Sequence, residues 1–151
     1  MSSVSLTGAD TIQIDSRVLR DLADLDCVKL SFPNDIAAMK VSKNGNTIYA
    51  LNETGKIAEC ELRVLLGSDD DKYLNSRLQE MKGDLSGFIL LTGSFAKRVG
   101  DGQGNLSTKI YQCSGGVFKK QPEAKTSAEG DTEQSVSIYM ISFHNDNISI
   151  Q

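Results

Sequence analysis

Between Val28 and Met81 the hydrophobic pattern changes from strand-like alternation to helical spacing. In residues 28–32 apolar side chains occupy every second position and polar side chains lie between them. Because successive side chains of a strand leave opposite faces of the sheet, this alternation predicts a half-buried strand. Pro33 ends it, since proline has no amide hydrogen to donate to the ladder. Asn44-Gly45 then lies between two short apolar segments and favours a tight hairpin with positive φ at both turn positions.

A longer strand is predicted after a turn at Asn52–Gly55. Alternate positions of this strand are apolar, and the positions between them are charged. The predicted sheet therefore has one apolar side and one charged side. The apolar set consists of Ala58, Cys60, Leu62, Val64 and Leu66, and the charged set consists of Glu59, Glu61 and Arg63.

An amphipathic helix is predicted directly after this strand. Ser68 is a favourable N-cap residue, and Asp71, three positions on, completes a capping-box-like pair. The acidic residues 69–71 occupy the first turn, where the helix dipole favours negative charge. Gly83 fits the C′ position at the other end. A narrow apolar stripe, which can cover one face of a small sheet, is formed by Leu74, Leu78 and Met81.

Further strands are predicted on both sides of this unit. The continuous apolar run Phe88–Leu91 predicts a strand buried on both faces, and the uncharged segment Ser135–Phe143 predicts a buried central strand. Gly115-Gly116 marks a bulge or a tight bend, and the sheet region is expected to end at Val117–Lys120. The segments assigned to these strands are Thr11–Asp15, Arg17–Leu19, Gly87–Phe95, Lys109–Cys113 and Ser135–Phe143.

Three segments are predicted as an arm or as loops. Residues 1–10 are rich in Ser, Thr and Gly and are expected to form an arm that orders only on contact. The glycine-rich segment Gly100–Asn105 lacks the lysine and the following helix of a phosphate-binding loop, so a flexible connection is the better interpretation. Residues 122–134 contain no large apolar side chain and are expected to be a solvated loop or a segment that orders against a neighbour.

The composition limits the possible classes of function. A chain of 151 residues fits one domain, here 1–151. Its net charge of −4 argues against the usual basic nucleic-acid-binding surface. It contains no apolar run long enough to span a bilayer, and its first residues lack the pattern of a signal peptide, so synthesis in the cytoplasm is the default expectation.

The sequence contains no recognisable catalytic, cofactor or metal site. Cys27, Cys60 and Cys113 are widely spaced and the single histidine is His144, so a zinc site is not expected. Three reduced, buried thiols are the simplest interpretation, and disulfides between subunits are the alternative. An enzyme is disfavoured because His144 lies in a polar context without a nucleophile motif. A monomeric ligand-binding barrel is disfavoured because few aromatic residues are available to line a cavity.

The predicted elements leave much of the sheet uncovered. One helix and a thin core do not hide the faces and edges of six or seven strands, and exposed edges pair readily with another chain. We therefore expect a mainly β fold with one α-helix, sandwich-like or barrel-like, whose strands join those of neighbouring subunits. Closing the sheet through copies of itself into a ring barrel would remove its edges.

Three phrases of the sequence resemble the major tail tube protein of bacteriophages, particularly those with contractile tails. They are V-K-L-S-F-P-N-D-I, K-x-S-K-N-G-N-T-I-Y-A-L-N-E-T-G-K and L-L-G-S-D-D-D-K-Y-L-N-S-R-L, within Arg17–Lys82. The resemblance implies a structural virion protein in the tail, made in the host cytoplasm. Its hexameric rings would stack into a hollow tube with sheath, baseplate and tail terminator proteins as partners.

The resemblance also implies that DNA passes through the lumen without specific binding. A neutral or acidic wall would serve this role, since lysine and arginine bind phosphates strongly. We expect Glu59 and Glu61 on the channel face with Arg63 in a local ion pair, although an ordinary solvated outer face explains them equally well. Residues 1–10, 100–105 and 122–134 are the candidate contacts between subunits or rings. A tailocin tube or a type VI-like injection tube has the same predicted layout.

Overall fold

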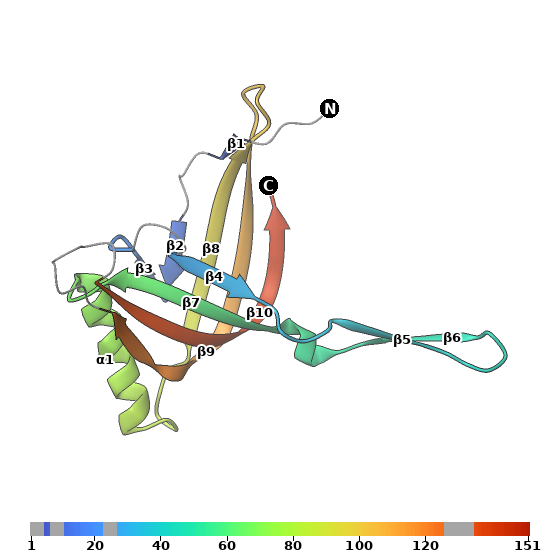
Figure 1. Cartoon of the computed structure of the whole chain (residues 1–151), viewed down its shortest axis with the longest axis horizontal. Coiled ribbons are helices and arrows are strands. Elements are labelled where there is room, and N and C mark those ends of the chain that lie inside the picture. Colours follow the sequence, from blue (N-terminus) through green and yellow to red (C-terminus); the bar gives the residue numbers. More distant parts are fainter. Residues whose placement is uncertain (1–4, 7–10, 23–26, 126–134) are drawn as a thin grey trace.

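The computed structural model describes residues 5–6, 11–22, 27–125 and 135–151 (Figure 1). Within these residues the chain is mainly β-strand with one α-helix, as the sequence predicts. The elements are β1 (Ser5–Leu6), β2 (Thr11–Ile14), β3 (Arg17–Val18), β4 (Val28–Ser31), β5 (Ala37–Val41), β6 (Thr47–Leu51), the 3₁₀ helix η1 (Glu53–Lys56), β7 (Ile57–Leu65), α1 (Asp69–Gly83), β8 (Leu91–Gly100), β9 (Leu106–Lys125) and β10 (Val136–Ile150).

The body of the molecule is one antiparallel sheet of eight strands. Its order is β3-β2-β8-β9-β10-β7-β4, and β1 pairs with β8 beside β2. The uncharged strand β10 lies between β9 and β7, so the prediction of a central strand over residues 135–143 is confirmed. The sheet is not closed into a barrel, because β3 and β4 are its two ends.

The long strand β9 is irregular at a glycine pair, as predicted. Leu91 of β8 pairs with Gly116, whereas Gly93 pairs with Cys113, so β9 contains one extra residue at this point. The register with β10 shifts at the same place. Gly115 has φ +63°, which a glycine adopts without the steric cost of a Cβ atom. This bulge divides β9 into a half that pairs with both β8 and β10 and a half that pairs with β10 alone.

The hydrophobic core lies between α1 and one face of the sheet. Leu74 and Leu78 of the helix are buried, as the predicted stripe requires. The aromatic rings of Phe95 and Phe143 meet edge to face at 6.1 Å between centroids. The buried residues on β7 are Ala58, Cys60, Leu62 and Val64, which confirms the predicted alternation of that strand.

The predicted start of the helix is confirmed, and its predicted end is displaced. The Asp71 amide donates to the Ser68 hydroxyl at 3.3 Å, and the Gly67 amide donates to the Asp71 carboxylate at 2.8 Å, which together form a capping arrangement. Gly83 is the last helical residue and not the C′ residue, and Asp84 is the C-cap. No helix in the described part of the chain combines the length and apolar character needed to cross a bilayer.

Two predictions of buried apolar residues are wrong. β8 begins at Leu91, and the preceding Ile89 and Leu90 are 78% and 47% exposed. The turn at residues 84–87 that closes α1 places these two side chains outside the sheet. Leu66 follows the end of β7 and is 44% exposed, because the chain turns at this point to enter the helix.

The extent of the sheet also differs from the prediction. β9 continues to Lys125, so the sheet does not end at residues 117–120, and residues 122–125 are strand and not loop. Register shifts opposite Met140 keep this half of β9 paired with β10 despite its polar sequence. Residues 126–134 lie outside the described part of the chain. The predicted arm at 1–10 is described only at Ser5–Leu6, which form β1.

Candidate functional site

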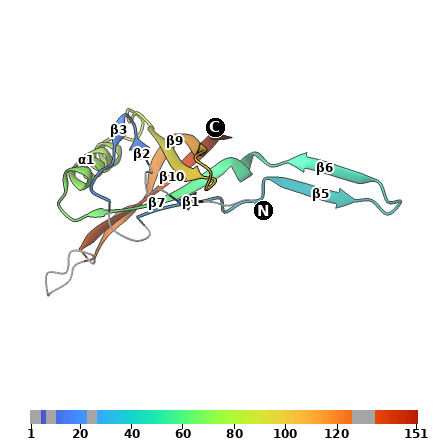
Figure 2. The same cartoon turned by 90° about the horizontal axis from the view of Figure 1, so that it is seen from above.

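The most distinctive surface is a two-stranded hairpin that projects from the body (Figure 2). β5 and β6 pair only with each other in the described part of the chain, and every residue of both strands is exposed. The sequence predicts this hairpin but places it in line with the neighbouring strands, whereas the structure forms a separate sheet. An isolated hairpin is marginally stable in water, so this one depends on its attachment to the body or on a partner.

The two faces of the hairpin differ in composition. Met39 lies opposite Tyr49, and Ala37 lies opposite Leu51, so these residues share one face with Val41 and Thr47. The other face presents Ala38, Lys40, Ile48 and Ala50. We call the first surface the apolar hairpin face and define it by its four large members, which are 56–75% exposed: Met39, Val41, Tyr49 and Leu51.

The base of the hairpin is fixed to η1. The Asn52 amide donates to the Ile36 carbonyl at 2.8 Å, and the Asn34 side chain donates to the Thr54 carbonyl at 3.3 Å. Gly55 packs so closely that a Cβ atom on it would lie 2.4 Å from the Ile36 Cα atom. Any larger residue at position 55 would therefore displace the backbone that directs the hairpin.

The tip of the hairpin is a longer loop than the predicted tight turn. The Ser42 amide donates to the Asn46 carbonyl at 2.7 Å, and the Gly45 amide donates to the Ser42 carbonyl at 3.0 Å. Gly45 has φ +85°, and Asn44 is not among the described residues with positive φ. A wider loop with a single left-handed glycine replaces the two-residue turn.

The open sheet provides further unpaired backbone. β4 pairs only with β7, and the second half of β9 pairs only with β10. Beyond His144, β10 pairs only with β9. Among the described residues these edges have no further strand beside them, and unpaired edges of this kind favour addition of strands from another chain.

The charged face of β7 is compensated by neighbouring lysine and arginine. Glu59 forms an ion pair with Lys119 of β9, and Glu61 lies 3.5 Å from Arg63, which confirms the predicted local pairing of that arginine. Lys29 of β4 lies directly opposite Glu61 in the register. This face is therefore close to charge balance and not simply acidic.

The helix is held against the body by a buried carboxylate that sequence reasoning missed. Asp70 is 1% exposed and accepts hydrogen bonds from the amides of Arg20 at 2.6 Å and Asp21 at 2.7 Å. The Arg17 guanidinium lies 3.0 Å from the same carboxylate. The sequence explains residues 69–71 by the helix dipole alone, and nothing in it distinguishes Asp70 from Asp69.

A second polar connection joins α1 to the turn between β2 and β3. Asp15, at φ +56°, accepts a hydrogen bond from the Tyr73 hydroxyl at 2.7 Å and one from the Thr92 amide at 3.2 Å. Burial, followed by the hydrogen bond to Asp15, raises the pKa of Tyr73 to about 12. Arg77 also approaches Asp15, at 3.3 Å.

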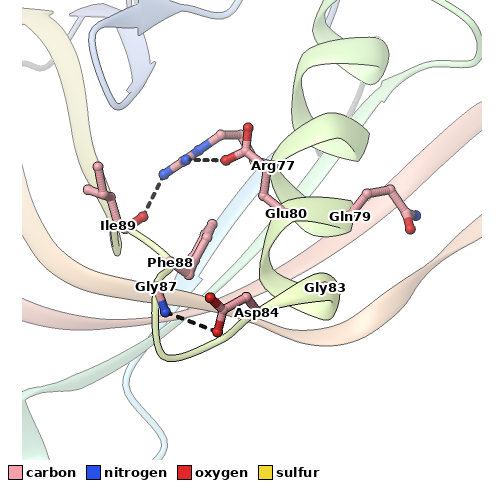
Figure 3. Close-up of a pocket in the computed structure, with 8 residues that line it drawn as sticks. All are labelled: Arg77, Gln79, Glu80, Gly83, Asp84, Gly87, Phe88 and Ile89. Carbon is pink, nitrogen blue, oxygen red and sulfur yellow. Dashed lines mark hydrogen bonds and ion pairs between the residues drawn. The ribbon is translucent and has the colours of Figure 1, made fainter.

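A shallow pocket of about 350 Å³ lies beside the C-terminal half of α1 (Figure 3). Arg77 donates to Glu80 at 2.8 Å and to the Ile89 carbonyl at 2.6 Å, and its guanidinium lies 4.7 Å from the centre of the Phe88 ring. Asp84 accepts from the Gly87 amide at 3.2 Å. The hydrogen bond from Ser86, followed by that from Gly87, lowers the pKa of Asp84, so it stays ionised.

The glycine-rich connection between β8 and β9 is closed by its own side chains. Asp101 accepts hydrogen bonds from the Gln103 amide at 2.7 Å and from the Asn105 side chain at 2.7 Å. The bond from Asn105, followed by that from Gln103, lowers the pKa of Asp101. A carboxylate at the centre of this loop is unsuitable for binding phosphate, in agreement with the prediction of a simple connection.

The cysteines and the histidine do not gather into a site. Cys60 and Cys113 are buried, and burial raises the pKa of both thiols. These two therefore cannot reach another subunit, and the half-buried Cys27 is the remaining candidate for an intersubunit disulfide. His144 belongs to β10, is exposed and lies 3.1 Å from Asp146. No group of three potential metal ligands occurs within the described residues.

Comparison with known proteins identifies the fold. No protein-family model matches the chain, and no curated protein matches it. Solved structures do match it, and two of them belong to an extracellular contractile injection system called PVC. A chain of its sheath-tube complex in the extended state has a TM-score of 0.51 and 11% identity, covering 94% of this chain and 87% of the other. A chain of its sheath/tube terminator has a TM-score of 0.54 and 9% identity, covering 96% and 94%.

The chain therefore shares its fold with these two chains of a contractile injection system. The likeness extends over nearly the whole chain. At 9–11% identity it establishes the fold and not the role of any residue.

Proposed function

We propose that this chain is a structural subunit of the hollow tube of a contractile tail or contractile injection system. The observation that carries the proposal is the open eight-stranded sheet, whose free edges lie in a fold shared with a chain of a sheath-tube complex. A sheet with free edges gains hydrogen bonds and loses exposed backbone when copies add to it. The proposed role is structural and not enzymatic.

In the proposed assembly six copies form a ring, and rings stack into a tube. The free edges of β4, β9 and β10 would pair between copies around the ring. The hairpin and the segments 1–10, 100–105 and 122–134 would contact neighbouring subunits or rings. The expected partners are a sheath protein, a baseplate and a terminator. From the resemblance to bacteriophage tail tube proteins we propose that the chain belongs to the tail of a virion.

We further propose that the face of β7 with Glu59 and Glu61 lines the lumen. The ion pairs of these residues with Lys119 and Arg63 give a wall that neither holds nor strongly repels a polyanion. Such a wall suits the passage of DNA, and it equally suits an effector protein in a tailocin-like or type VI-like device. Glu59→Lys combined with Glu61→Lys should slow DNA passage in assembled particles, and unchanged delivery would exclude this placement.

The first experiment is negative-stain microscopy of the purified protein, with light scattering on the same sample. Rings or tubes with a central hole are the expected result. A compact monomer whose loops are protected in hydrogen exchange would overturn the proposal and would favour a monomeric ligand-binding barrel. Addition of a tail initiator tests whether a soluble monomer is competent to assemble.

A further inference from the structure

Two apolar surfaces are exposed in the single chain. One is the apolar hairpin face. The other is the loop between α1 and β8, where Leu85, Ile89 and Leu90 are 61%, 78% and 47% exposed. We call these three residues, with the pocket lined by Phe88, the α1–β8 loop surface. Exposed apolar surfaces that are rimmed by polar residues often mark interaction sites, so two such surfaces in one chain point to partners that cover them.

The two surfaces lie at opposite ends of the molecule. The hairpin extends along the longest axis away from the body, and α1 with its following loop lies at the other end (Figures 1 and 2). The hairpin of one chain therefore does not cover the loop of the same chain. A contact between the two surfaces must join two copies.

The tip of the hairpin and the pocket carry opposite charges. The hairpin has no acidic residue between Ile36 and Asn52, and of its two lysines Lys40 lies on the face opposite the apolar hairpin face. Lys43 lies in the loop at the tip. The pocket presents Glu80 and Asp84, and its only cation, Arg77, is already bonded to Glu80 and to the Ile89 carbonyl (Figure 3). Asp84 accepts hydrogen bonds from Ser86 and Gly87 of its own loop and forms no ion pair among the described residues. Its carboxylate is therefore available to an approaching lysine.

We propose that the apolar hairpin face of one copy packs on the α1–β8 loop surface of another copy, with Lys43 near Asp84. This inference rests on the proposed function, because it requires self-assembly. Two different surfaces meet in this contact, so it is heterologous and repeats from copy to copy instead of closing a dimer. It would join tube subunits in a fixed direction and would bury the apolar residues that the monomer exposes.

The test is a photo-crosslink in assembled protein. In one variant benzoylphenylalanine replaces Tyr49 on the apolar hairpin face, which is 75% exposed. In the matched control it replaces Ile48 on the opposite face, which is 66% exposed. Each variant is mixed with isotope-labelled unmodified chain before assembly. We expect position 49 to crosslink to residues 84–90 of the labelled chain. Position 48 should not give this crosslink.

A second measurement does not depend on crosslinking chemistry. Ile89→Ser should raise the critical concentration for assembly about tenfold, since burial of a large aliphatic side chain is lost. Ile48→Ser is the matched change on the opposite hairpin face and should leave the critical concentration for assembly unaltered. Both side chains are exposed in the single chain, so neither substitution should prevent folding.

The outcomes separate this inference from the proposed function. Tubes that form without a crosslink between position 49 and residues 84–90 overturn the contact and leave the tube role intact. A crosslink from position 49 to a different tail protein, or a larger effect of Ile48→Ser than of Ile89→Ser, also overturns it. A chain that, with a tail initiator present, neither assembles nor gives any crosslink between copies overturns both.

Discussion

Strand β7 and the hairpin β5–β6 each have a face of large apolar side chains, but the surroundings of these two faces are opposite. In β7 the apolar residues, such as Leu62 and Val64, are 0% exposed beneath α1. In the hairpin, Met39 and Tyr49 are 65% and 75% exposed. An apolar face in the sequence therefore does not by itself tell whether the same chain covers that face.

The two regions also differ in how they are held. The body has hydrogen bonds between residues far apart in sequence, such as those that reach Asp70 from the segment after β3. The hairpin is held by the hydrogen bonds of its own ladder, by those at its tip and by the close packing of its base at Gly55. Folding stability should therefore reside in the body, whereas changes in the hairpin should act on assembly.

The largest expected effect is the loss of a core leucine. Leu62→Ala should lower the free energy of unfolding by about 2–5 kcal/mol, because it removes a fully buried side chain and leaves a cavity. Leu51→Ala is the matched change in the hairpin, at 62% exposure, and should alter it by less than about 0.5 kcal/mol. Denaturant unfolding of the unassembled protein measures both. Equal losses would show that the hairpin is part of the cooperative core.

The next effect is the loss of the buried carboxylate. Asp70→Ala should destabilise the body by about 2–4 kcal/mol, because it leaves two backbone amides and the Arg17 guanidinium without their acceptor. The matched control is Asp69→Ala, which removes an exposed acidic residue from the same helical turn and should cost about 0.3–1 kcal/mol. Similar losses of stability for the two variants would mean that Asp70 contributes only through its interaction with the helix dipole.

These two aspartates show where sequence reasoning stops. The spacing of Ser68 and Asp71 predicts the helix start correctly, because capping is a local interaction. The partners of Asp70 lie far away in the chain: Arg20, for example, is 50 positions before it. Only the three-dimensional arrangement brings them to the helix, so no local pattern could assign this residue.

The Phe88–Leu91 run illustrates a different failure. Its apolar character predicts a buried strand, and Leu91 is indeed fully buried at the start of β8. Ile89 and Leu90 lie in the loop before it and are exposed. The helix and β7 follow from periodicity, and the central position of β10 follows from its lack of charge. The strand ends and the separation of the hairpin depend on tertiary packing.

An intermediate effect is expected at alkaline pH. Burial, followed by a hydrogen bond to Asp71, raises the pKa of Tyr139, and burial raises that of Tyr73 to about 12. Because both phenols ionise less readily in the folded state than in the unfolded state, their contribution to stability is complete below about pH 10 and falls as the pH rises further. Tyr139→Phe should cost about 1 kcal/mol at neutral pH and flatten this alkaline decline.

Stability curves against pH for the unmodified chain, Tyr139→Phe and Tyr73→Phe measure this decline. Tyr49 serves as the control, since Tyr49→Phe alters an exposed phenol of the hairpin and should leave the curve unchanged. An alkaline decline that persists in the double variant of Tyr73 and Tyr139 would assign it to other groups.

The smallest effect on folding, and the sharpest test of the comparison, is expected in the hairpin itself. Met39 and Tyr49 face each other across the strands, and such a pair stabilises its own ladder by about 0.2–1 kcal/mol. Met39→Ser with Tyr49→Ser should therefore speed amide exchange within β5 and β6 while the global unfolding free energy stays within about 0.5 kcal/mol. Assembly should nevertheless be lost, since the cover for these side chains is another copy. A variant that assembles normally would show that the apolar hairpin face is not part of the contact between copies.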